Sequence, residues 1–300
     1  DLPVSVPKPH YLEDCASRKI DGTNWVLQGH SQAGNRTGFF VPQLNLGLDA
    51  GMNSFKTFAT ILISHSHADH SYNITCLAMG QGDFESKPLV VCPADMVPPL
   101  DAYTRAAQSL NCCFSTTMSE PVVRAKGVSP GDTMTLCNGK CHVRVVQCVH
   151  EVPTCGFILS TVSKKLKPEY RGMAGKDIAG LRKAGAEVSQ EVLTERIAFL
   201  GDTTVEVFTL NPCLLKVPIV CVECTFVSSS VEDAETATSR GHTSWRGLDP
   251  FVKAAPDTLF ILIHFSRRYK DADIVEFFEG LEGGCPDNVL LWLDSGPHGP

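Results

Sequence analysis

The 300-residue sequence lacks an excess of positive charge, and it lacks any long uninterrupted apolar segment. Its formal net charge of −7 excludes a surface that is basic overall, so a polyanionic partner would have to meet a local basic patch. No apolar run approaches the roughly 20 residues that cross a bilayer, which argues against a membrane protein. The first ten residues also lack the charged and then apolar pattern of a signal peptide.

Cysteine spacings typical of a disulfide framework or a zinc ribbon are also missing. The thirteen cysteines are odd in number and scattered, and most of them lie within apolar segments. This pattern is typical of reduced, packed thiols in a cytosolic-type protein. We therefore expect the cytoplasm or the nucleus as the compartment, while a sequence that does not begin with Met leaves room for an organellar targeting segment ahead of it.

Internal repeats, low-complexity linkers and breaks in composition are absent as well, and 43% of the residues are hydrophobic. A chain of this length and composition can bury a full core, so we expect one domain over residues 1–300. Short apolar and β-branched runs predict strands at 44–50, 59–65, 89–93, 143–150, 155–162, 196–202, 219–226, 258–265 and 289–294. Helical spacing predicts helices at 101–111, 176–185, 244–255 and 271–284, the last ending on a Gly-Gly pair. This order predicts a layered sheet protein with helices outside.

Three of the ten histidines and an aspartate are concentrated in HSHADH, residues 65–70, directly after an apolar segment. Residues two apart in an extended segment point the same way, so His65 and His67 can meet at one ion. Asp69 and His70, past a turn, can reach a second ion. Imidazole and carboxylate ligands suit zinc, with manganese or iron as weaker alternatives. A single histidine is usually a packed or surface residue, but this cluster favours a metal site.

Two ions require more ligands than this motif provides, and further candidates lie in later strands or at their ends. They are His150, Asp202 and His264. An aspartate at a strand end is ordinarily a turn or capping residue, but here we interpret Asp202 as a carboxylate that bridges two cations. His30, in a glycine-containing loop, is a weak candidate for lining a site. The sequence gives no polar context to His10, His142 and His298.

Motifs spread along most of the chain resemble one family. They are HSHADH at 65–70, GDTT at 201–204, ECTF at 223–226, GHTS at 241–244 and HFSRRY at 264–269. HxHxDH alone is shared across the metallo-β-lactamase superfamily, whereas the later motifs in this order resemble tRNase Z, the endonuclease that processes tRNA 3′ ends. Residues 164–188 resemble the short, plant-type members. The resemblance implies an α/β fold, the metallo-β-lactamase αββα sandwich, in which two packed mixed β-sheets carry helices on their outer faces.

The resemblance also implies two zinc ions per chain, with manganese or iron as alternatives. It assigns the metal ligands in two sets that share Asp202 as a bridge. The sets are completed by His65, His67 and His150 at one ion and by Asp69, His70 and His264 at the other.

Three further roles follow from the resemblance. Asp49 lies behind the metal histidines, where a carboxylate fixes the tautomer of an imidazole. Glu223 and His242 form a carboxylate–histidine pair beside the metals, and we assign His242 as the general acid that protonates the leaving 3′ oxygen. Asp69 has a catalytic role in addition to metal binding, because it can orient or deprotonate the attacking hydroxide.

Basic residues gather between two of the ligand-bearing segments. From residue 164 to 183, seven Lys or Arg side chains accompany two acidic ones, in a chain that is negative overall. Such a run is as often an ordinary solvated face, but its position favours phosphate binding, because contacts of Lys and Arg to the backbone dominate RNA affinity. We expect residues 157–197 to form a shortened RNA-binding insertion. The candidate RNA-binding residues are Lys164, Lys165, Lys167, Arg171, Arg267 and Arg268.

These observations predict a zinc-dependent endoribonuclease that removes 3′ trailers from tRNA precursors by phosphodiester hydrolysis. Precursor tRNA is the expected partner, and the resemblance implies a homodimer. The Pro-x-Lys-x-Arg-Asn loop of many family members is replaced by QAGNRTGF at 32–39, so the cleavage nucleotide is left open. One alternative is a phosphodiesterase or thioester hydrolase of the same superfamily that acts on a small substrate. Another is a catalytically inactive relative that binds nucleic acid.

Overall fold

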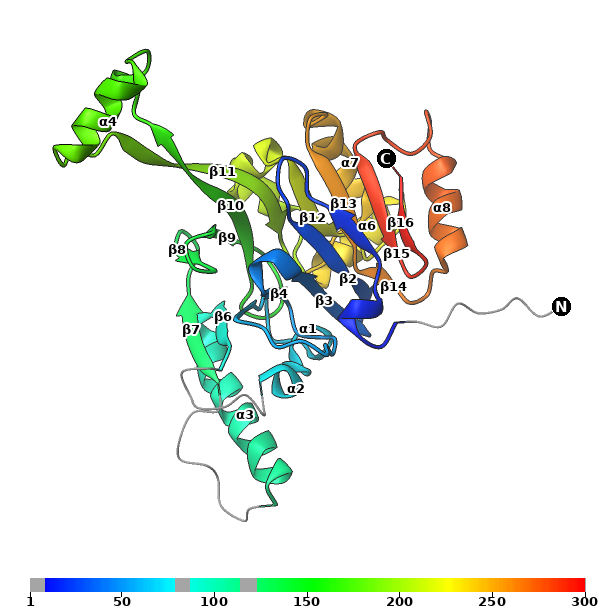
Figure 1. Ribbon diagram of the computed structural model, residues 1–300. Helices are drawn as coiled ribbons and strands as arrows, with labels where there is room; N and C mark the ends of the chain where they lie inside the picture. Colours follow the sequence, from blue (N-terminus) through cyan, green and yellow to red (C-terminus); the bar gives the residue numbers. More distant parts are fainter. Residues whose placement is uncertain (1–8, 79–86, 114–122, 300) are drawn as a thin grey trace.

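Two β-sheets packed face to face form the centre of the molecule, with helices on their outer sides (Figure 1). The computed structural model describes residues 9–78, 87–113 and 123–299. Within these residues, the first sheet has the order β1-β2-β3-β4-β5-β6-β7, and β14 pairs with β2. Neighbours from β1 to β4 are antiparallel, and those from β4 to β7 are parallel. The strands are β1 (Ser17–Lys19), β2 (Val26–Ala33), β3 (Arg36–Val41), β4 (Leu46–Leu48), β5 (Thr60–Leu62), β6 (Leu89–Pro93), β7 (Arg124–Val128) and β14 (Phe265–Ser266).

The second sheet has the order β8-β9-β10-β11-β12-β13-β15-β16 within the described residues. Its strands are β8 (Thr133–Leu136), β9 (Cys141–Gln147), β10 (Cys155–Leu166), β11 (Ser189–Phe199), β12 (Ile219–Glu223), β13 (Leu259–Ile263), β15 (Val289–Leu293) and β16 (Gly296–His298). β11, β12, β13 and β15 are parallel neighbours. Because the carboxyl ends of parallel strands meet at one edge of a sheet, the loops that follow them can build a shared site there.

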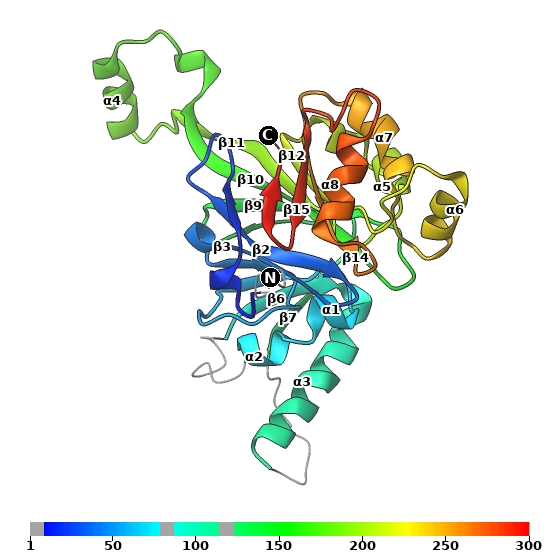
Figure 2. The same ribbon diagram turned by 90° about the vertical axis from the view of Figure 1, so that its right-hand side faces the viewer.

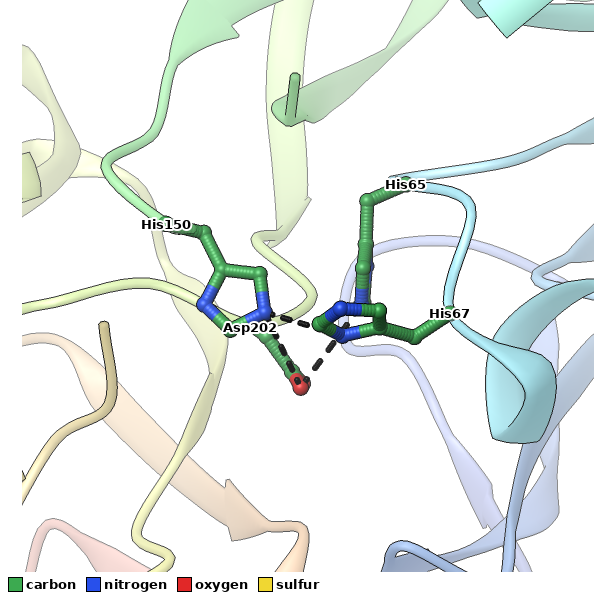
Figure 3. Close-up of side chains that lie close together, drawn as sticks. All are labelled: His65, His67, His150 and Asp202. Atoms are coloured by element: carbon green, nitrogen blue, oxygen red, sulfur yellow. Dashed lines mark hydrogen bonds and ion pairs between the residues drawn. The ribbon is translucent and has the colours of Figure 1, made fainter. Parts of the chain in front are cut away.

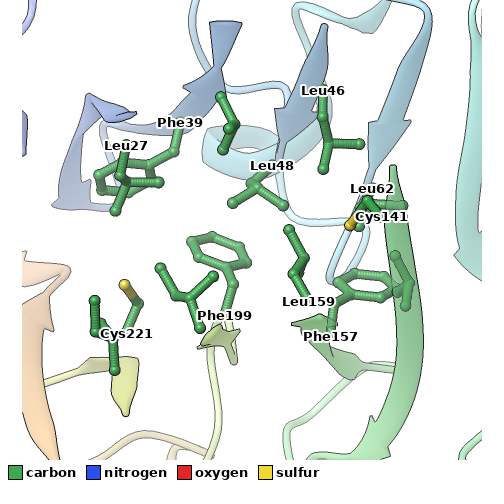
Figure 4. Close-up of a cluster of buried hydrophobic side chains, with 14 of the residues drawn as sticks. Leu27, Phe39, Leu46, Leu48, Leu62, Cys141, Phe157, Leu159, Phe199 and Cys221 are labelled. Atoms are coloured by element: carbon green, nitrogen blue, oxygen red, sulfur yellow. The ribbon is translucent and has the colours of Figure 1, made fainter. Parts of the chain in front are cut away.

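Apolar side chains from the facing sides of both sheets form the inner core (Figure 4). From the first sheet, Phe39 is fully buried and contacts Phe199 of the second sheet edge to face, with ring centroids 5.8 Å apart. Leu48 and Leu62 lie across from Phe157 in the same cluster. Strands that alternate in this way bury one face in the sandwich and offer the other to the helices.

Most of the eight described α-helices lie on the outer sides of the sheets, whereas α4 stands apart on the arm. α2 and α3 pack on the first sheet, and α5, α7 and α8 pack on the second (Figure 1, Figure 2). α7 begins behind Ser244, whose hydroxyl accepts a hydrogen bond from Gly247 N, and this cap satisfies one free N–H of the first turn. The bounds are α1 (Ala68–Ser71), α2 (Ile74–Ala78), α3 (Val97–Asn111), α4 (Gly175–Lys183), α5 (Glu206–Leu210), α6 (Val231–Ser239), α7 (Trp245–Ala254) and α8 (Asp271–Glu279).

An arm projects from the body where β10 and β11 run past the edge of the second sheet and carry α4 at their tip (Figure 1). The strands pair antiparallel from Phe157↔Phe199 out to Leu166↔Ser189, with a register shift between Leu159 and Ser160. α4 has no buried residue. The arm therefore stands on its own hairpin hydrogen bonds and exposes its charged side chains.

The thiols are distributed unevenly. All thirteen cysteines lie in the described residues as free thiols, and seven of them are buried. Burial raises the pKa of Cys92 and of Cys148 to about 12. The exposed thiols are Cys76, Cys112 and Cys113, at the end of the molecule that holds α2 and α3.

Each strand and helix expected from the sequence overlaps an element of the same type. The helix expected at 271–284 was wrong at its end, because α8 stops at Glu279 and is capped by Gly280. Gly283 and Gly284 lie in the following turn, where both have positive φ angles that suit glycine. The strands β1, β2, β3, β7, β8 and β16 were not expected. None of the described helices is long and apolar enough to cross a membrane.

Candidate metal centre

The candidate ligands lie in loops at one edge of the sandwich. After β5 the chain continues in extended form to His67, and α1 begins at the next residue. His150 follows β9, Asp202 follows β11 and His264 directly follows β13. β9 and β11 both pair antiparallel with β10, so they point the same way and their carboxyl ends lie at the same edge. The order of the strands thus brings together side chains far apart in the sequence.

The first set of candidate ligands is His65, His67, His150 and Asp202 (Figure 3). One ligand atom from each lies within 4.8 Å of the others. His150 Nε2 is 3.1 Å from His67 Nδ1, and Asp202 Oδ2 is 3.7 Å from His65 Nε2. His65 Nε2 is buried and has no hydrogen-bond partner in the part of the chain that the structure describes. A buried polar atom of this kind calls for a partner, which a cation would provide.

The second set is Asp69, His70 and His264. His70 Nε2 and His264 Nε2 are 3.2 Å apart, and Asp69 Oδ2 is 3.6 Å from the first and 3.3 Å from the second. Asp202 Oδ1 lies 3.3 Å from His70 Nε2 and 3.4 Å from His264 Nε2. Asp202 therefore directs one carboxylate oxygen to each set, which is the geometry of a bridging ligand.

Asp49 and Ser64 fix the orientation of two of these histidines. Asp49 Oδ2 is 2.7 Å from His70 Nδ1, so that nitrogen carries the proton and Nε2 is free to bind a cation. Asp49 also accepts hydrogen bonds from Ser64 N (2.7 Å) and Ser64 Oγ (2.9 Å). Because the Ser64 hydroxyl donates to Asp49, it accepts from His65 Nδ1 at 3.0 Å, which leaves the lone pair of His65 on Nε2.

Equivalent acceptors stand behind His150 and His264. His150 Nδ1 is 2.7 Å from the carbonyl oxygen of Gly241. The Thr225 hydroxyl donates to Glu223 and lies 3.0 Å from His264 Nδ1, from which it accepts. Both histidines thus keep Nε2 unprotonated toward the cluster. A shell of this kind holds ligand rings in place before a metal arrives.

The electrostatics of the cluster favour positive charge. Burial opposes a charged His70, but the carboxylates of Asp202 and Asp49 raise its pKa well above the usual value. Burial also opposes a charged Asp202, and the neighbouring His264 and His70 nonetheless hold its pKa well below the usual range. The same carboxylates would attract a metal cation. The imidazole and carboxylate donors fit divalent ions such as zinc, manganese or iron.

Glu223 and His242 form a pair beside the cluster. Glu223 is fully buried, and His242 Nδ1 lies 3.0 Å and 3.1 Å from its two carboxylate oxygens. The same carboxylate accepts the backbone N–H groups of Thr203 (2.8 Å) and Thr243 (3.1 Å), so its position is fixed. Burial acts against a charged His242, but Glu223 and Asp202 raise its pKa to about 9. The His242 ring is 21% exposed, so the pair connects the interior to the surface.

The backbone of His264 and Asp49 is unusual. Both residues adopt positive φ angles, 61° for His264 and 58° for Asp49. Left-handed backbone is uncommon for residues other than glycine and marks places where the surroundings impose a conformation. At His264 the chain leaves β13 of the second sheet and enters β14, which pairs with β2 of the first sheet. The residue therefore stands at the crossing between the sheets.

The structure does not bring the expected RNA-binding residues together in one patch. Lys164 and Lys165 are exposed on β10, near the outer end of the arm's hairpin, and Arg171 is exposed in the turn before α4. Lys164 faces Glu191 across the hairpin, which reduces the local positive charge. Arg267 and Arg268 are exposed directly after β14 and close in sequence to His264. Arg268 is held by ring contacts, with its guanidinium 4.6 Å from the Phe226 ring.

Besides His242, four histidines lie outside the cluster, and three of them are on strands. His30 is buried on β2, and its Nε2 is 3.5 Å from Asp294 Oδ1, so it connects β2 with the residue that follows β15. His298 lies on β16, with Nε2 3.9 Å from Glu279. His142 lies on β9 of the second sheet. None of the three belongs to the ligand sets found among the described residues.

A profile of the β-lactamase superfamily domain matches residues 50–265, which include every candidate ligand. The chain belongs to this superfamily. The chain is also 26% identical over 275 residues to tRNase Z TRZ1 of Arabidopsis thaliana, an alignment that covers 90% of this chain and 95% of that protein. It is 28% identical over 276 residues to the chloroplastic tRNase Z TRZ2 of the same plant, covering 90% and 76%.

Solved structures support the same superfamily fold. YhfI from Bacillus subtilis superimposes with a TM-score of 0.53 at 13% identity, covering 85% of this chain and 91% of that one. A long form RNase Z from yeast gives 0.51 at 15% identity, covering 92% of this chain but only 38% of that one. The metallo-β-lactamase sandwich, the resemblance to tRNase Z and the class of metal-dependent hydrolase are confirmed.

Sequence reasoning missed the hydroxyl groups of this superfamily site. Ser64 and Thr225 each lie between an imidazole and a carboxylate, yet neither stands out in the sequence as more than a neighbour of a ligand. Their position directly before His65 and inside the ECTF motif was the available signal. Gly34 N was also missed, and it donates to Asp69 Oδ2 at 2.8 Å from the turn between β2 and β3.

Proposed function

We propose that the protein is an endoribonuclease that removes 3′ trailers from tRNA precursors by phosphodiester hydrolysis, with two zinc ions bound at the cluster. The observation that carries the proposal is the combination of seven converging metal-type donors with a buried carboxylate–histidine pair beside them. The plant relatives described as tRNase Z support the choice of RNA, and the superfamily supports the use of divalent metal. Manganese or iron would suit the same donors.

The seven residues would hold the cations in two adjacent positions. His65, His67 and His150 serve one position, the second is served by the set around Asp69, and Asp202 serves both. Cations held there supply a nucleophile at neutral pH and neutralise charge on the phosphate. Asp69 keeps its orientation through the N–H of Gly34, which donates to its Oδ2 at 2.8 Å. It can therefore orient the attacking water.

His242 is placed to protonate the leaving 3′ oxygen. Glu223 occupies its Nδ1, so Nε2 is the nitrogen that can transfer a proton. The ring is partly exposed while its carboxylate partner is buried, which lets the proton-transferring edge reach a substrate at the surface. A positioned acid of this kind contributes about 10²- to 10⁴-fold to a rate.

The arm gives the proposed enzyme a second contact with a large substrate. Its exposed lysines and arginines lie away from the cluster, where a small phosphodiester would not reach them (Figure 1). Contacts to the RNA backbone at this distance position the substrate without reading its sequence. The arm therefore favours a polymeric substrate over the small-substrate alternative. We also propose a homodimer, which sedimentation of the purified protein would test.

Incubation with a 3′-extended tRNA precursor and zinc or manganese tests the proposal, with the product ends determined by sequencing. We expect a single cut at the 3′ side of the mature tRNA, a 5′ phosphate on the released trailer, and no cut by Asp202→Ala. An unstructured RNA of the same length serves as the control substrate. Hydrolysis of a nitrophenyl phosphodiester without cleavage of the precursor would favour the small-substrate phosphodiesterase instead.

A further inference from the structure

A cavity of about 450 Å³ lies beside the metal centre and has no role in the proposed mechanism. Tyr11, Arg36, Asn53 and Asn73 are among the residues that line it, together with the backbone of Gly51. Its volume is within the range of about 300–1,000 Å³ that is usual for small-molecule sites.

The cavity and the metal centre share a wall. A Cβ atom on Gly51 would lie 1.7 Å from the carbonyl oxygen of Asp69, so the backbone at Gly51 packs directly against α1. Arg36 begins β3, two residues after Gly34, whose N–H donates to the Asp69 carboxylate. Gly51 and α1 therefore lie between the cavity and the candidate metal centre.

Two of the lining residues carry polar atoms without hydrogen-bond partners, one a donor and the other an acceptor. Arg36 Nε and Asn53 Oδ1 are both shielded from solvent, and neither forms a hydrogen bond within the described residues. The first is a cationic donor and the second is an acceptor. A matching ligand must combine an anionic acceptor with a hydroxyl or amino donor. The residues that line the cavity include no carboxylate, and the nearby Glu13 accepts hydrogen bonds from Ser54 Oγ and Phe55 N.

An aromatic surface completes the surroundings. The ring of Tyr11 stacks on Phe55 with centroids 3.8 Å apart and an interplanar angle of 23°. Phe55 is 69% exposed, which is unusual for so large an apolar side chain. Exposed aromatic rings beside a cation are the features with which proteins bind unpaired nucleotides.

We propose that this cavity binds one nucleotide of the RNA next to the cleaved phosphodiester. Arg36 contacts its phosphate, Asn53 Oδ1 accepts from a ribose hydroxyl or base amino group, and the base stacks on the Tyr11 and Phe55 rings. This inference rests on the proposed function, because it takes RNA to be the substrate.

Direct binding measurements test the cavity separately from catalysis. The probes are two RNAs that lack the scissile bond, an acceptor-stem minihelix without a trailer and a short trailer oligonucleotide. Affinity is measured with the metal-loaded protein over a range of salt concentrations. The variants are Arg36→Ala, Arg36→Lys and Asn53→Asp, and the matched control is Lys126→Ala, an exposed lysine on β7, four strands away from β3.

We expect Arg36→Ala to weaken one of the two probes about tenfold, and to reduce the slope of log affinity against log salt by about 0.7–0.9 for the lost phosphate contact. Arg36→Lys should give an intermediate loss, because it keeps the charge but not the fork of donors. Asn53→Asp should reduce the affinity as much as Arg36→Ala does, because the new carboxylate pairs with Arg36 and withdraws it from the phosphate. Melting temperatures within a few degrees of wild type show that the variants are folded.

Equal affinities of Arg36→Ala and Lys126→Ala for both RNAs would overturn the proposal, whether or not a free nucleoside monophosphate binds. Loss caused by Asn53→Asp that persists in the Arg36→Ala background would also contradict it, because the two residues would then act independently. A wild-type protein that binds these probes through Arg36 but does not cleave a tRNA precursor would count against the proposed function and leave the nucleotide site standing.

Discussion

At the scale of single residues, the candidate centre depends on what stands behind each histidine. Four imidazoles direct one nitrogen to an acceptor outside the cluster, and the acceptors are the side chains of Asp49, Ser64 and Thr225 and the carbonyl of Gly241. These contacts fix the tautomer before any ion binds, so affinity for metal does not require the rings to reorganise. The candidate ligands and the acceptors behind them thus depend on one another, so a single substitution in either group should affect metal binding.

Replacing Asp202 with alanine should cause the largest loss of metal, because one carboxylate oxygen faces each ligand set. We expect about two metal ions per wild-type chain after gentle purification in zinc-supplied medium, and less than one in Asp202→Ala. Elemental analysis measures both values, and His142→Ala on β9 is the matched control because it lies outside the ligand sets. A wild-type content below one ion per chain would argue against a two-metal centre.

Replacing His242 with alanine should separate catalysis from metal binding. We expect unchanged metal content and precursor affinity, with a cleavage rate lowered by about 10²- to 10⁴-fold, because the leaving oxygen loses its proton donor. Activity of the variant on a nitrophenyl phosphodiester should fall far less, since the leaving group of that substrate needs no proton. Equal losses on both substrates, or loss of metal, would show that His242 supports the centre and that the proton comes from elsewhere.

Glu223→Gln should destabilise the fold as well as weaken the acid. The wild-type carboxylate accepts from Thr203 N, Thr243 N and the Thr225 hydroxyl. An amide of the same shape points its NH₂ group at one of these donors, and a buried donor left without an acceptor costs about 1–3 kcal/mol. Thermal unfolding should show a lower melting temperature than for His242→Ala. An unchanged melting temperature would mean that the surroundings of Glu223 rearrange easily.

At the scale of elements, the arm is the part of the molecule whose structure depends least on packing against the two sheets. β10 and β11 hold it through their own ladder, and α4 at the tip contributes no buried residue. Its charge is mixed, because Lys164 and Lys165 face Glu191 and Gln190 across the hairpin. Removing a positive or a negative charge near the outer end of this hairpin should therefore change the affinity for substrate in opposite directions.

Changing Lys164, Lys165 and Lys167 together to alanine should weaken binding of precursor tRNA. Each lost phosphate contact should flatten the dependence of log affinity on log salt by about 0.7–0.9. Glu191→Gln, the matched variant on the opposite strand, should change affinity in the other direction. Unchanged affinity and slope in the triple variant would show that this part of the arm is an ordinary solvated surface.

The sequence predicted strands and converging candidate ligands well where a local pattern determined them. Apolar runs gave most of the parallel strands, although not β7, and HSHADH gave four candidate ligands, because both signals lie within a few residues. β14 was not expected as a separate strand, because its two residues pair with β2 only after His264 has turned the chain. Ser64 and Thr225 were missed because a hydroxyl acquires its role from groups up to 39 positions away, which no local pattern contains.

At the scale of the whole molecule, the candidate centre joins the two sheets. The HSHADH ligands follow a strand of the first sheet, whereas His150, Asp202 and His264 follow strands of the second. A ligand that binds only the folded state stabilises it in proportion to RT ln(1 + [L]/Kd), about 2.7 kcal/mol at one hundred times Kd. Bound metal should therefore stabilise the folded state, in which the two sheets are packed together.

Chelation should lower the melting temperature of the wild-type protein by several degrees. The melting temperature of Asp202→Ala should be lower from the start and should change little when chelator is added, because this variant has already lost the bridging ligand. Differential scanning fluorimetry with and without 1,10-phenanthroline measures both. Equal chelator shifts in the two proteins would show that the metal does not contribute to holding the sheets together.

The uneven distribution of thiols makes the molecule easy to label at chosen points. Alkylation at neutral pH should reach Cys76, Cys112 and Cys113, while buried thiols such as Cys148 should react only after denaturation. Cys112 and Cys113 follow α3, at the opposite end of the molecule from the arm (Figure 1). Dyes at the end of α3 and on α4 would therefore span the length of the protein. Energy transfer between them would report movement of the arm when RNA binds, with both fluorophores far from the candidate metal centre.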